Sequence, residues 1–345
     1  MVKTTRTAVM RGKGNVCIEE RMLPEVGEND VLVQVQACNI CTSEYGVYNG
    51  ARTRPSPLVF GHEWAGKVLA VGQKVMDIKM GDLVACGYQF DPYSPESLQG
   101  RTSECRNILS ADIPNPDGYY GNAGFAEYAV MSQIALYKIR QDADPAIAGL
   151  LEPIATVVSG IRRMNVKPSD TVVVIGAGTM GLLNALVLRE YGCRVIVTEL
   201  LEKKLKTARE LGLEVVDSAA VDAVAEVKRL TNEKGADAVV LAVSAQKATD
   251  QAFDMLKKNR GKLLLFAAGS PSPVIKTDVN TLHYRKIEIY GTYGADHVDF
   301  AEAARLINKG MDFSAVIEAR YPFNEMEDAM KAACVPGAYR IAVIM

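Results

Sequence analysis

Apolar and polar residues follow two different patterns along the chain. In its first third, short segments such as Val31–Ala37 and Gly66–Val71 alternate apolar and polar positions. Such alternation predicts strands with one buried face. Residues 145–163 then carry apolar residues at helical spacing, with an interruption expected at Pro153. A continuous apolar run over 171–175 predicts a strand that is buried on both faces of a parallel sheet.

Strands and helices alternate after this run. Helices are predicted at residues 180–191, 202–211, 220–232 and 246–258, and strands at 194–198, 214–216, 237–242, 261–266 and 286–290. The alternation predicts an α/β domain with a doubly wound parallel sheet. The end of the chain adds predicted helices at 300–309 and 325–333 and a strand at 340–344. The two parts differ in character, and we expect the functional site in the cleft between them.

Composition limits the class of protein. The chain has 345 residues and a mass of 37.4 kDa, which favours two domains over one core. Hydrophobic residues make up 48% and charged residues 23%, as in folded globular proteins. A net charge of −2 argues against binding to nucleic acid or to an anionic membrane surface. No apolar run is long enough to span a bilayer.

The cysteines and the first residues indicate a compartment. Seven cysteines are an odd number, and they are scattered over a long chain. This favours a reducing environment, in which thiols bind metal or pack in the core, over a disulfide framework. The first residues lack the apolar stretch of a secretion signal. We therefore expect a cytoplasmic protein.

A glycine-rich turn follows the apolar strand and opens a helix. Gly176 permits a tight turn, Gly178 lets a pyrophosphate approach the backbone, and Gly181 lets helix and strand pack closely. Glu199 ends the next strand, where an acid binds a ribose hydroxyl pair, so NAD is favoured over NADP, although Lys203 and Lys204 could reach a 2′-phosphate. The alternative interpretation is that these glycines form an ordinary tight turn in an α/β domain that binds no dinucleotide. The residues expected to bind the dinucleotide are Gly176, Gly178, Thr179, Met180, Gly181, Glu199, Lys204 and Val243.

Candidate metal ligands occur at three places. The segment 38–44 contains Cys38 and Cys41, the next candidates are His62 and Glu63, and Glu152 precedes a proline. Thiolate, imidazole and carboxylate are zinc ligands, and three of them with an open position form a catalytic site. The residues alone leave other readings open, because the cysteines could be a redox pair or buried thiols, and Glu152 could cap a helix.

Six motifs together give the chain a family resemblance. Over essentially its whole length it resembles the zinc-dependent medium-chain dehydrogenase/reductase family, closest in pattern to the polyol and sorbitol dehydrogenase-like branch. The matching segments are 39–44, 61–66, 81–84, 124–128, 152–153 and 176–181. The resemblance implies a mainly β, GroES-like catalytic domain over 1–155, completed by 295–345, and a Rossmann NAD-binding domain over 156–294. It also implies a homodimer or homotetramer, formed through an edge strand near 286–292.

The resemblance assigns roles residue by residue. It makes Cys41, not Cys38, the first ligand of one catalytic Zn²⁺ and His62 the second, while Glu63 and Glu152 compete for the third position. Glu63 and Glu152 are therefore also candidate catalytic residues. Ser43 matches the hydroxyl that takes the substrate proton. Thr156 matches a residue beside the nicotinamide, and Arg340 matches an arginine that reaches the pyrophosphate.

The chain departs from the family pattern in two places. Four cysteines hold a structural zinc in many relatives, and the matching residues here are Asp91, Ser94, Ser97 and Cys105, so we expect no second zinc. A relay histidine found in many relatives is replaced by Gly46. The relay could end in water near Ser43, or Glu44, Tyr45 or Tyr48 could substitute.

Substrate residues are harder to assign. The arginine–tyrosine pair that binds polyols in sorbitol dehydrogenases is not evident near His297. Arg52 and Arg54 flank the loop before Gly61, and because arginine suits carboxylate and phosphate, an anionic substrate is one hypothesis, with two solvated arginines as the alternative. The candidate substrate residues are Tyr48, Arg52, Arg54 and His297.

The expected activity is hydride transfer between a secondary alcohol and NAD. The alcohol would be a polyol, a sugar alcohol or a sugar derivative, and zinc would stabilise the developing alkoxide. The alternatives are a zinc-free quinone or enoyl reductase of the same superfamily and a non-catalytic NAD-binding protein. The expected partner is thus a small molecule, with no nucleic acid or membrane involved.

Overall fold

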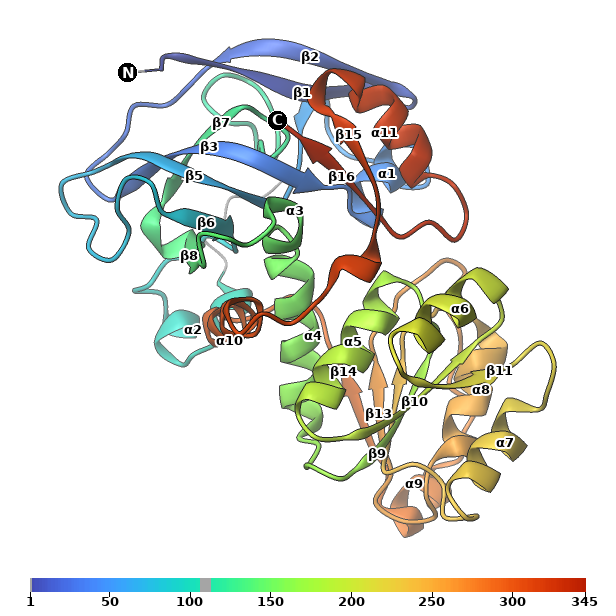
Figure 1. Cartoon of the computed structure of the whole chain (residues 1–345). Coiled ribbons are helices and arrows are strands. Elements are labelled where there is room, and N and C mark those ends of the chain that lie inside the picture. The colour runs from blue at the N-terminus through green and yellow to red at the C-terminus, as the bar shows by residue number, and fades with distance from the viewer. Residues whose placement is uncertain (1, 106–112) are drawn as a thin grey trace. The chain divides into compact units, whose positions relative to one another are not determined.

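The chain folds into two compact units. The computed structural model describes residues 2–105 and 113–345, and it is drawn in Figure 1. One unit combines Met1–Ala155 with Ala295–Met345, and the other is Thr156–Gly294. None of the helices in the described residues combines the length and the apolar character that crossing a bilayer requires.

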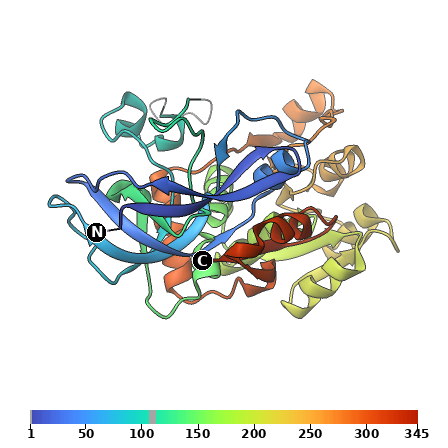
Figure 2. The same ribbon diagram turned by 90° about the horizontal axis from the view of Figure 1, so that it is seen from above.

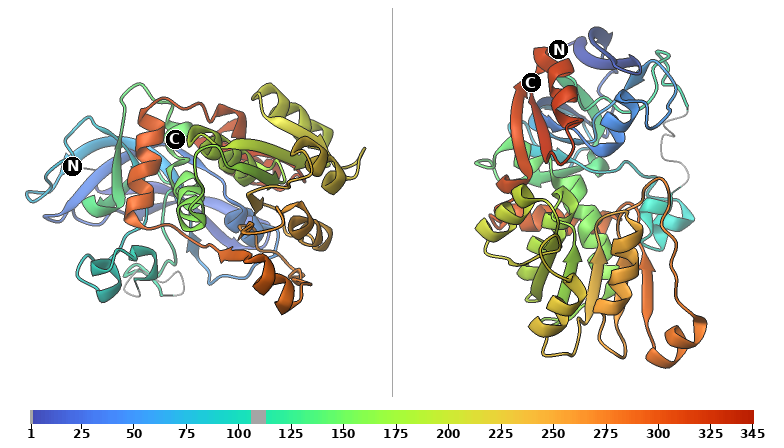
Figure 3. Two further views of the ribbon diagram at one scale, coloured as in Figure 1. Left: turned by 90° about the horizontal axis from the view of Figure 1, so that it is seen from below. Right: turned by 90° about the vertical axis from the view of Figure 1, so that its right-hand side faces the viewer.

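The unit Thr156–Gly294 contains a six-stranded parallel sheet. Its order is β11-β10-β9-β12-β13-β14, so the order reverses between β9 and β12 as in a Rossmann fold. The strands are β9 (Thr171–Ile175), β10 (Arg194–Glu199), β11 (Glu214–Asp217), β12 (Ala238–Leu241), β13 (Lys262–Leu265) and β14 (Glu288–Gly291). The helices are α5 (Thr179–Glu190), α6 (Glu202–Glu210), α7 (Ala223–Leu230), α8 (Gln246–Met255) and α9 (Val279–Arg285). Helices lie on both sides of the sheet (Figure 3), and the predicted doubly wound fold is confirmed.

The other unit is mainly β and contains two sheets. The smaller has the order β2-β1-β4, and the larger has the order β15-β16-β3-β5-β6-β8 with β7 paired to β3. Their strands are β1 (Thr4–Gly12), β2 (Asn15–Met22), β3 (Asp30–Asn39), β4 (Leu58–Val59), β5 (Glu63–Val71), β6 (Leu83–Cys86), β7 (Tyr128–Ser132), β8 (Leu136–Ile139), β15 (Ile317–Pro322) and β16 (Arg340–Ile344). The mainly β architecture expected for this part is confirmed.

Strand pairing brings distant segments together at one end of the larger sheet. Asn39 at the end of β3 pairs with Glu63 at the start of β5, and Ala342 of β16 pairs with the same Asn39. Helix α1 (Thr42–Tyr48) follows β3 directly. This register places Cys41, His62 and Arg340 near one another, although they lie far apart in the sequence.

The remaining helices of this unit are short or amphipathic. They are α2 (Pro95–Leu98), α3 (Pro145–Ala148), α10 (His297–Asn308) and α11 (Met326–Ala333), while α4 (Leu151–Met164) runs across the boundary between the units. Figure 2 shows α11 beside the last strand, and α11 packs against β16, β15 and β2.

Two predicted helix boundaries were wrong, and one helix was not predicted. The helical pattern over 145–163 breaks at Gly149 and Leu150 rather than at Pro153, which lies in the first turn of α4, where no N–H donor is needed. The helix predicted from Phe300 begins at His297, because Asp296 caps it. Helix α9 was missed, and its sequence is short and carries no buried residue.

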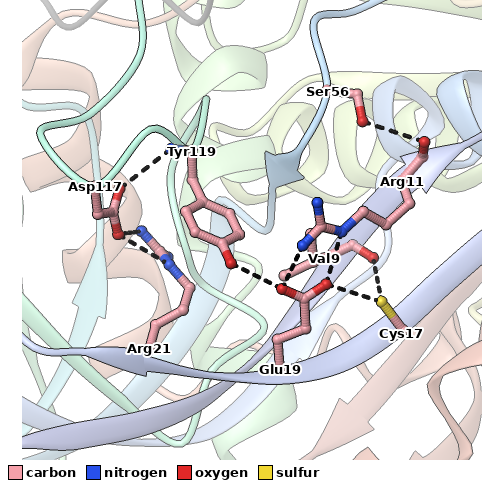
Figure 4. Close-up of polar contacts among 8 residues, drawn as sticks. All are labelled: Val9, Arg11, Cys17, Glu19, Arg21, Ser56, Asp117 and Tyr119. Carbon is pink, nitrogen blue, oxygen red and sulfur yellow. Dashed lines mark hydrogen bonds and ion pairs between the residues drawn. The ribbon is translucent and has the colours of Figure 1, made fainter.

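Figure 4 shows how the segment around Tyr119 is fixed to the hairpin of β1 and β2. The Tyr119 hydroxyl donates to Glu19 at 2.8 Å, and the guanidinium of Arg21 lies 4.4 Å from the Tyr119 ring centre and also binds Asp117. Glu19 accepts two further hydrogen bonds from Arg11, which lower the pKa of Glu19 to about 2. This polar cluster links Asp117 and Tyr119 to the hairpin of β1 and β2.

Candidate metal and dinucleotide sites

Three potential metal ligands meet where β3, α1 and β5 come together. One ligand atom each from Cys41, His62 and Glu63 lies within 4.8 Å of the others. Within the described parts of the chain, this is the one such group of three histidine, cysteine or acidic residues. Cys41 is the N-cap residue of α1, Glu63 is the first residue of β5, and His62 immediately precedes that strand.

Glu44 orients the histidine of this group. Its Oε1 lies 2.9 Å from Nδ1 of His62, and its Oε2 accepts a hydrogen bond from the Cys41 amide at 2.5 Å. An imidazole held at Nδ1 presents Nε2 to a metal, which is a common arrangement at zinc sites. Burial disfavours protonation of His62, but Glu44 and Cys41 outweigh this and raise the pKa of His62. The sequence suggested Glu44 only as a proton relay, so its contact with the ligand was missed.

Arg340 and Glu63 form a buried ion pair behind the ligands. Nη2 and Nε of Arg340 donate to the two carboxylate oxygens of Glu63 at 2.8 and 2.9 Å, and Nη2 also lies 3.7 Å from Sγ of Cys41. Burial raises the pKa of Glu63, although Arg340 opposes the shift. The expectation that Arg340 reaches the pyrophosphate stays a prediction, whereas its contact with Glu63 was not foreseen.

Glu152 belongs to the same cluster. Its side chain is buried, and Oε1 accepts a hydrogen bond from the hydroxyl of Tyr88. Its negative charge acts on Glu63, whose pKa it helps to raise, and on Arg340. The group of ligand atoms that lie within 4.8 Å of one another does not include an atom of Glu152. The assignment of Glu63 or Glu152 as the third metal ligand stays a prediction.

The charges and donor types of the cluster fit a zinc ion. Glu44, Glu63 and Glu152 are buried, and Arg340 is the one guanidinium among them. Even with His62 protonated, negative charge is in excess, and an unpaired buried charge is costly. Oε1 of Glu44 is also buried without a well-aligned hydrogen-bond donor. A divalent cation bound by sulfur, nitrogen and oxygen would compensate the excess.

The face of α1 beyond Cys41 carries Ser43 and Gly46, one helical turn apart. Ser43 is half-buried. A Cβ atom on Gly46 would meet Cδ of Arg52 at 3.2 Å and Nε at 3.5 Å, so the Arg52 side chain covers the position of the missing relay histidine. The Arg52 guanidinium forms no ion pair with any other described residue. The two arginines considered from the sequence therefore differ in that Arg52 lies against α1 at Gly46.

The other candidate substrate residues are dispersed. Tyr48 is 8% exposed and belongs to the hydrophobic core, where burial raises its pKa. Arg54 lies in the exposed loop. His297 packs between Phe90 and Tyr137, and its Nδ1 lies 2.6 Å from the Tyr137 hydroxyl. The structure thus brings Arg52 close to the residues of α1 but does not gather all four side chains.

The segment that holds a second zinc in many relatives is fixed by hydrogen bonds. The Asp91 amide donates to Sγ of Cys105 at 3.4 Å, and Ser94 and Ser97 bond to each other at 3.0 Å. The following residues bind the start of α10. The amide and hydroxyl of Ser103 donate to Asp296 at 3.0 and 2.7 Å, and the amide of His297 donates to the Thr102 hydroxyl at 2.7 Å.

The glycine turn of the other unit has the close contacts expected of a dinucleotide site. Gly176 has φ +100°, and a Cβ atom there would meet Val243 at 2.4 Å. A Cβ atom on Gly181 would lie 1.9 Å from the Gly176 carbonyl oxygen. Gly178 is the N-cap residue of α5 and has no side chain to cap the helix, so the helix N-terminus can receive a phosphate. Lys204 Nζ lies 3.6 Å from the position of a Gly178 Cβ atom.

Glu199 ties the end of β10 to the glycine turn. Its carboxylate accepts hydrogen bonds from the amides of Ala177, Leu200 and Leu201 at 2.7, 2.6 and 3.0 Å. The sequence assigned this carboxylate to the ribose, and the bond to Ala177 adds a structural role. Thr179 lies in the first turn of α5 and is buried, Met180 beside it is half-buried, and Thr156 is half-buried in α4.

The comparisons with known proteins agree with this picture. A model described as "Alcohol dehydrogenase GroES-like domain" matches residues 27–141, and one described as "Zinc-binding dehydrogenase" matches residues 179–309. An L-threonine 3-dehydrogenase of Saccharopolyspora erythraea is 30% identical over 90% of each chain, and a sorbitol dehydrogenase of Halalkalibacterium halodurans is 28% identical over 93% of each. A putative zinc-binding dehydrogenase from Sinorhizobium meliloti, solved with NADP, superposes with a TM-score of 0.87 at 24% identity over the full length of both chains.

Proposed function

Since the chain belongs to the zinc-dependent medium-chain dehydrogenase family, we propose that it transfers a hydride between a secondary alcohol and NAD. The observation that supports this reaction most directly is the convergence of Cys41, His62 and Glu63 within 4.8 Å. A zinc-free quinone or enoyl reductase would have no use for these ligands. Zinc held there would act as a Lewis acid on the alcohol oxygen, and the dinucleotide would accept the hydride.

The residues of the chain have separate tasks in this proposal. Cys41 and His62 hold the metal with a carboxylate, and Glu44 fixes the ring of His62. Ser43, two residues beyond Cys41, accepts the alcohol proton and passes it toward solvent. Gly46, where a relay histidine is missing, leaves the space above the helix to Arg52.

An anionic secondary alcohol is the substrate class that we favour. Arg52 presents a guanidinium one turn from Ser43, without a carboxylate partner among the described residues. Guanidinium groups suit bidentate recognition of carboxylate or phosphate. The relatives named L-threonine 3-dehydrogenase act, by that name, on a secondary alcohol that also carries a carboxylate. A sugar acid, a sugar phosphate or a hydroxy amino acid fits this description.

A substrate panel tests the proposal. Zinc-loaded protein is supplied with NAD and with polyols, sugar acids, sugar phosphates, cyclitols and L-threonine, and NADH formation is followed. We expect turnover that requires zinc and is faster with an anionic alcohol than with its neutral counterpart. Arg52→Ala should remove that preference, and Arg52→Lys should keep part of it. Turnover of quinones or enoyl compounds by zinc-free protein, with no alcohol oxidised, would refute the proposed reaction.

Oligomeric state and location belong to the same proposal. We expect a homodimer or homotetramer in the cytoplasm, with pairing through β14, the edge strand of the dinucleotide sheet. Light scattering on the purified protein checks the oligomer, and a monomer at micromolar concentration would contradict it.

A further inference from the structure

The two acidic residues beside the metal ligands are held by partners of different charge. Glu63 meets the guanidinium of Arg340 with both carboxylate oxygens. Glu152 accepts from the uncharged hydroxyl of Tyr88 with Oε1, and within residues 2–105 and 113–345 its Oε2 has no hydrogen-bond donor. Glu63 is therefore paired directly with a charged donor, whereas Glu152 is oriented by a neutral donor and interacts with Arg340 only through its charge, without a hydrogen bond.

Packing fixes the Tyr88 ring in place. Gly87 precedes it, and a Cβ atom on Gly87 would lie 2.7 Å from the Tyr137 ring and 3.0 Å from Phe300, so the chain approaches both rings closely. The Tyr88 ring then meets Phe300 edge to face, at 5.0 Å between centroids. A hydroxyl on a ring held in this way has little freedom to move, so it is a fixed donor for the glutamate.

We propose that Tyr88 is a positioning residue of the metal site, because it holds Oε1 of Glu152 and leaves Oε2 to a divalent cation. A long glutamate side chain must lose rotamer freedom to bind a metal, and Tyr88 orders it before the metal arrives. The Tyr88 hydroxyl is uncharged and therefore competes less with a cation for Glu152 than the hydrogen-bonded guanidinium of Arg340 does for Glu63. The role rests on the proposed zinc-dependent function.

The structure offers a matched control. Tyr137 packs against the same Phe300, at 5.5 Å between centroids, and its hydroxyl is also hydrogen-bonded, but to His297 rather than to a carboxylate of the metal site. Tyr88→Phe and Tyr137→Phe each remove one hydroxyl from the same aromatic cluster. Only the first loosens Glu152.

The experiment measures zinc affinity and the rate of zinc release to a chromogenic chelator, without substrate. Partners of metal ligands typically contribute about 10- to 100-fold to affinity, so we expect Tyr88→Phe to weaken zinc binding by about 10-fold or more. Tyr137→Phe should stay at the wild-type value, and Tyr88→Phe should add little in a Glu152→Ala background. Circular dichroism and thermal unfolding verify that each variant folds.

Two results would overturn the role of Tyr88. One is equal zinc affinity in Tyr88→Phe and wild type, and the other is a full-sized effect of Tyr88→Phe when Glu152 is already alanine. Neither of these two results would contradict the proposed dehydrogenase activity. Conversely, weakened zinc binding in Tyr88→Phe, together with no oxidation of any alcohol, would support the positioning role and refute the function.

Discussion

Arg340 and Glu63 form a two-pronged ion pair in which neither side chain reaches solvent to a significant extent: the side chains are 8% and 0% exposed. Removing one partner from such a pair leaves an uncompensated buried charge, which costs far more than the pair itself contributes. Although burial alone would lower the pKa of Arg340, Glu63 and Cys41 raise it, so the guanidinium stays charged at any pH at which the protein is folded.

We therefore expect Arg340→Met to destabilise the metal-free protein by about 3–5 kcal/mol. Urea unfolding measures the loss. Arg320→Met is the control, because Arg320 binds Asp144, the N-cap residue of α3, with a side chain that is 45% exposed, and such pairs contribute about 1 kcal/mol or less. The double variant Glu63→Gln, Arg340→Met should recover part of the stability. A single-variant loss as small as that of Arg320→Met would contradict the account.

The ligand assignment predicts a selective effect at Cys41. Cys41→Ser should reduce bound zinc to a small fraction of one ion per chain and abolish turnover, because serine is a poor zinc ligand at neutral pH. NADH binding, measured by fluorescence titration, should remain, since the glycine turn lies in the other unit. Cys38→Ala should keep its zinc. Loss of zinc in Cys38→Ala but not in Cys41→Ser would reverse the assignment.

The segment after α2 should depend on its bonds to α10. Thr102→Val removes the acceptor of the His297 amide and leaves that amide unpaired, which we expect to cost about 1–3 kcal/mol. Thr102→Ser keeps the hydroxyl and should retain most of the stability. Thermal unfolding compares the three proteins. Equal stability of Thr102→Val and wild type would show that the bond does not hold the segment.

His297 gives a pH dependence of known sign. Burial lowers the pKa of His297 below its ordinary value. As the pH falls below about 6.5, the unfolded chain therefore takes up a proton that the folded chain resists, and stability is lost. The decline of the unfolding free energy between about pH 7 and pH 5 should be shallower in His297→Asn than in wild type. His283→Asn, at an exposed histidine, should leave the slope unchanged.

Glu199 should govern the choice of dinucleotide. Its charge repels a 2′-phosphate, so Glu199→Gln should weaken the preference for NAD over NADP by about tenfold, equivalent to about 1.4 kcal/mol. The ratio of kcat/KM values for the two dinucleotides measures this change. The bond from the Ala177 amide would also weaken, which should raise KM for both. An unchanged ratio would show that Glu199 does not discriminate.

The fold was predictable because its signals are local. The apolar run at 171–175, the glycine turn and the alternation after it each depend on neighbouring residues, and the structure has the strands and helices close to the expected places. Helix α9 was not predicted because it is short and none of its residues is fully buried, so its sequence has no clear apolar periodicity. The break before α4 had a signal in Gly149, the C-cap residue of α3, but the prediction placed the break at Pro153 instead.

The candidate metal ligands were predictable from motifs, but their partners were not. Glu63 and Arg340 are 277 positions apart, and Tyr88 and Glu152 are 64 apart. No periodicity connects such pairs, because they are brought together by tertiary structure, such as the pairing of β16 with β3. Charge compensation inside a cluster depends on this register and is invisible in a single sequence.

The place of β16 in the larger sheet has a consequence for biosynthesis. This strand is inserted between β15 and β3, although it follows every other strand of its unit in sequence. During synthesis on the ribosome, β3 and β5 emerge early. Glu63 then has no guanidinium partner until Arg340 has been synthesised. The dinucleotide unit is one continuous stretch and can be completed before that. The dinucleotide unit can therefore be complete in a nascent chain before the other unit is, and a nonsense codon shortly before position 340 would leave Glu63 without its guanidinium partner.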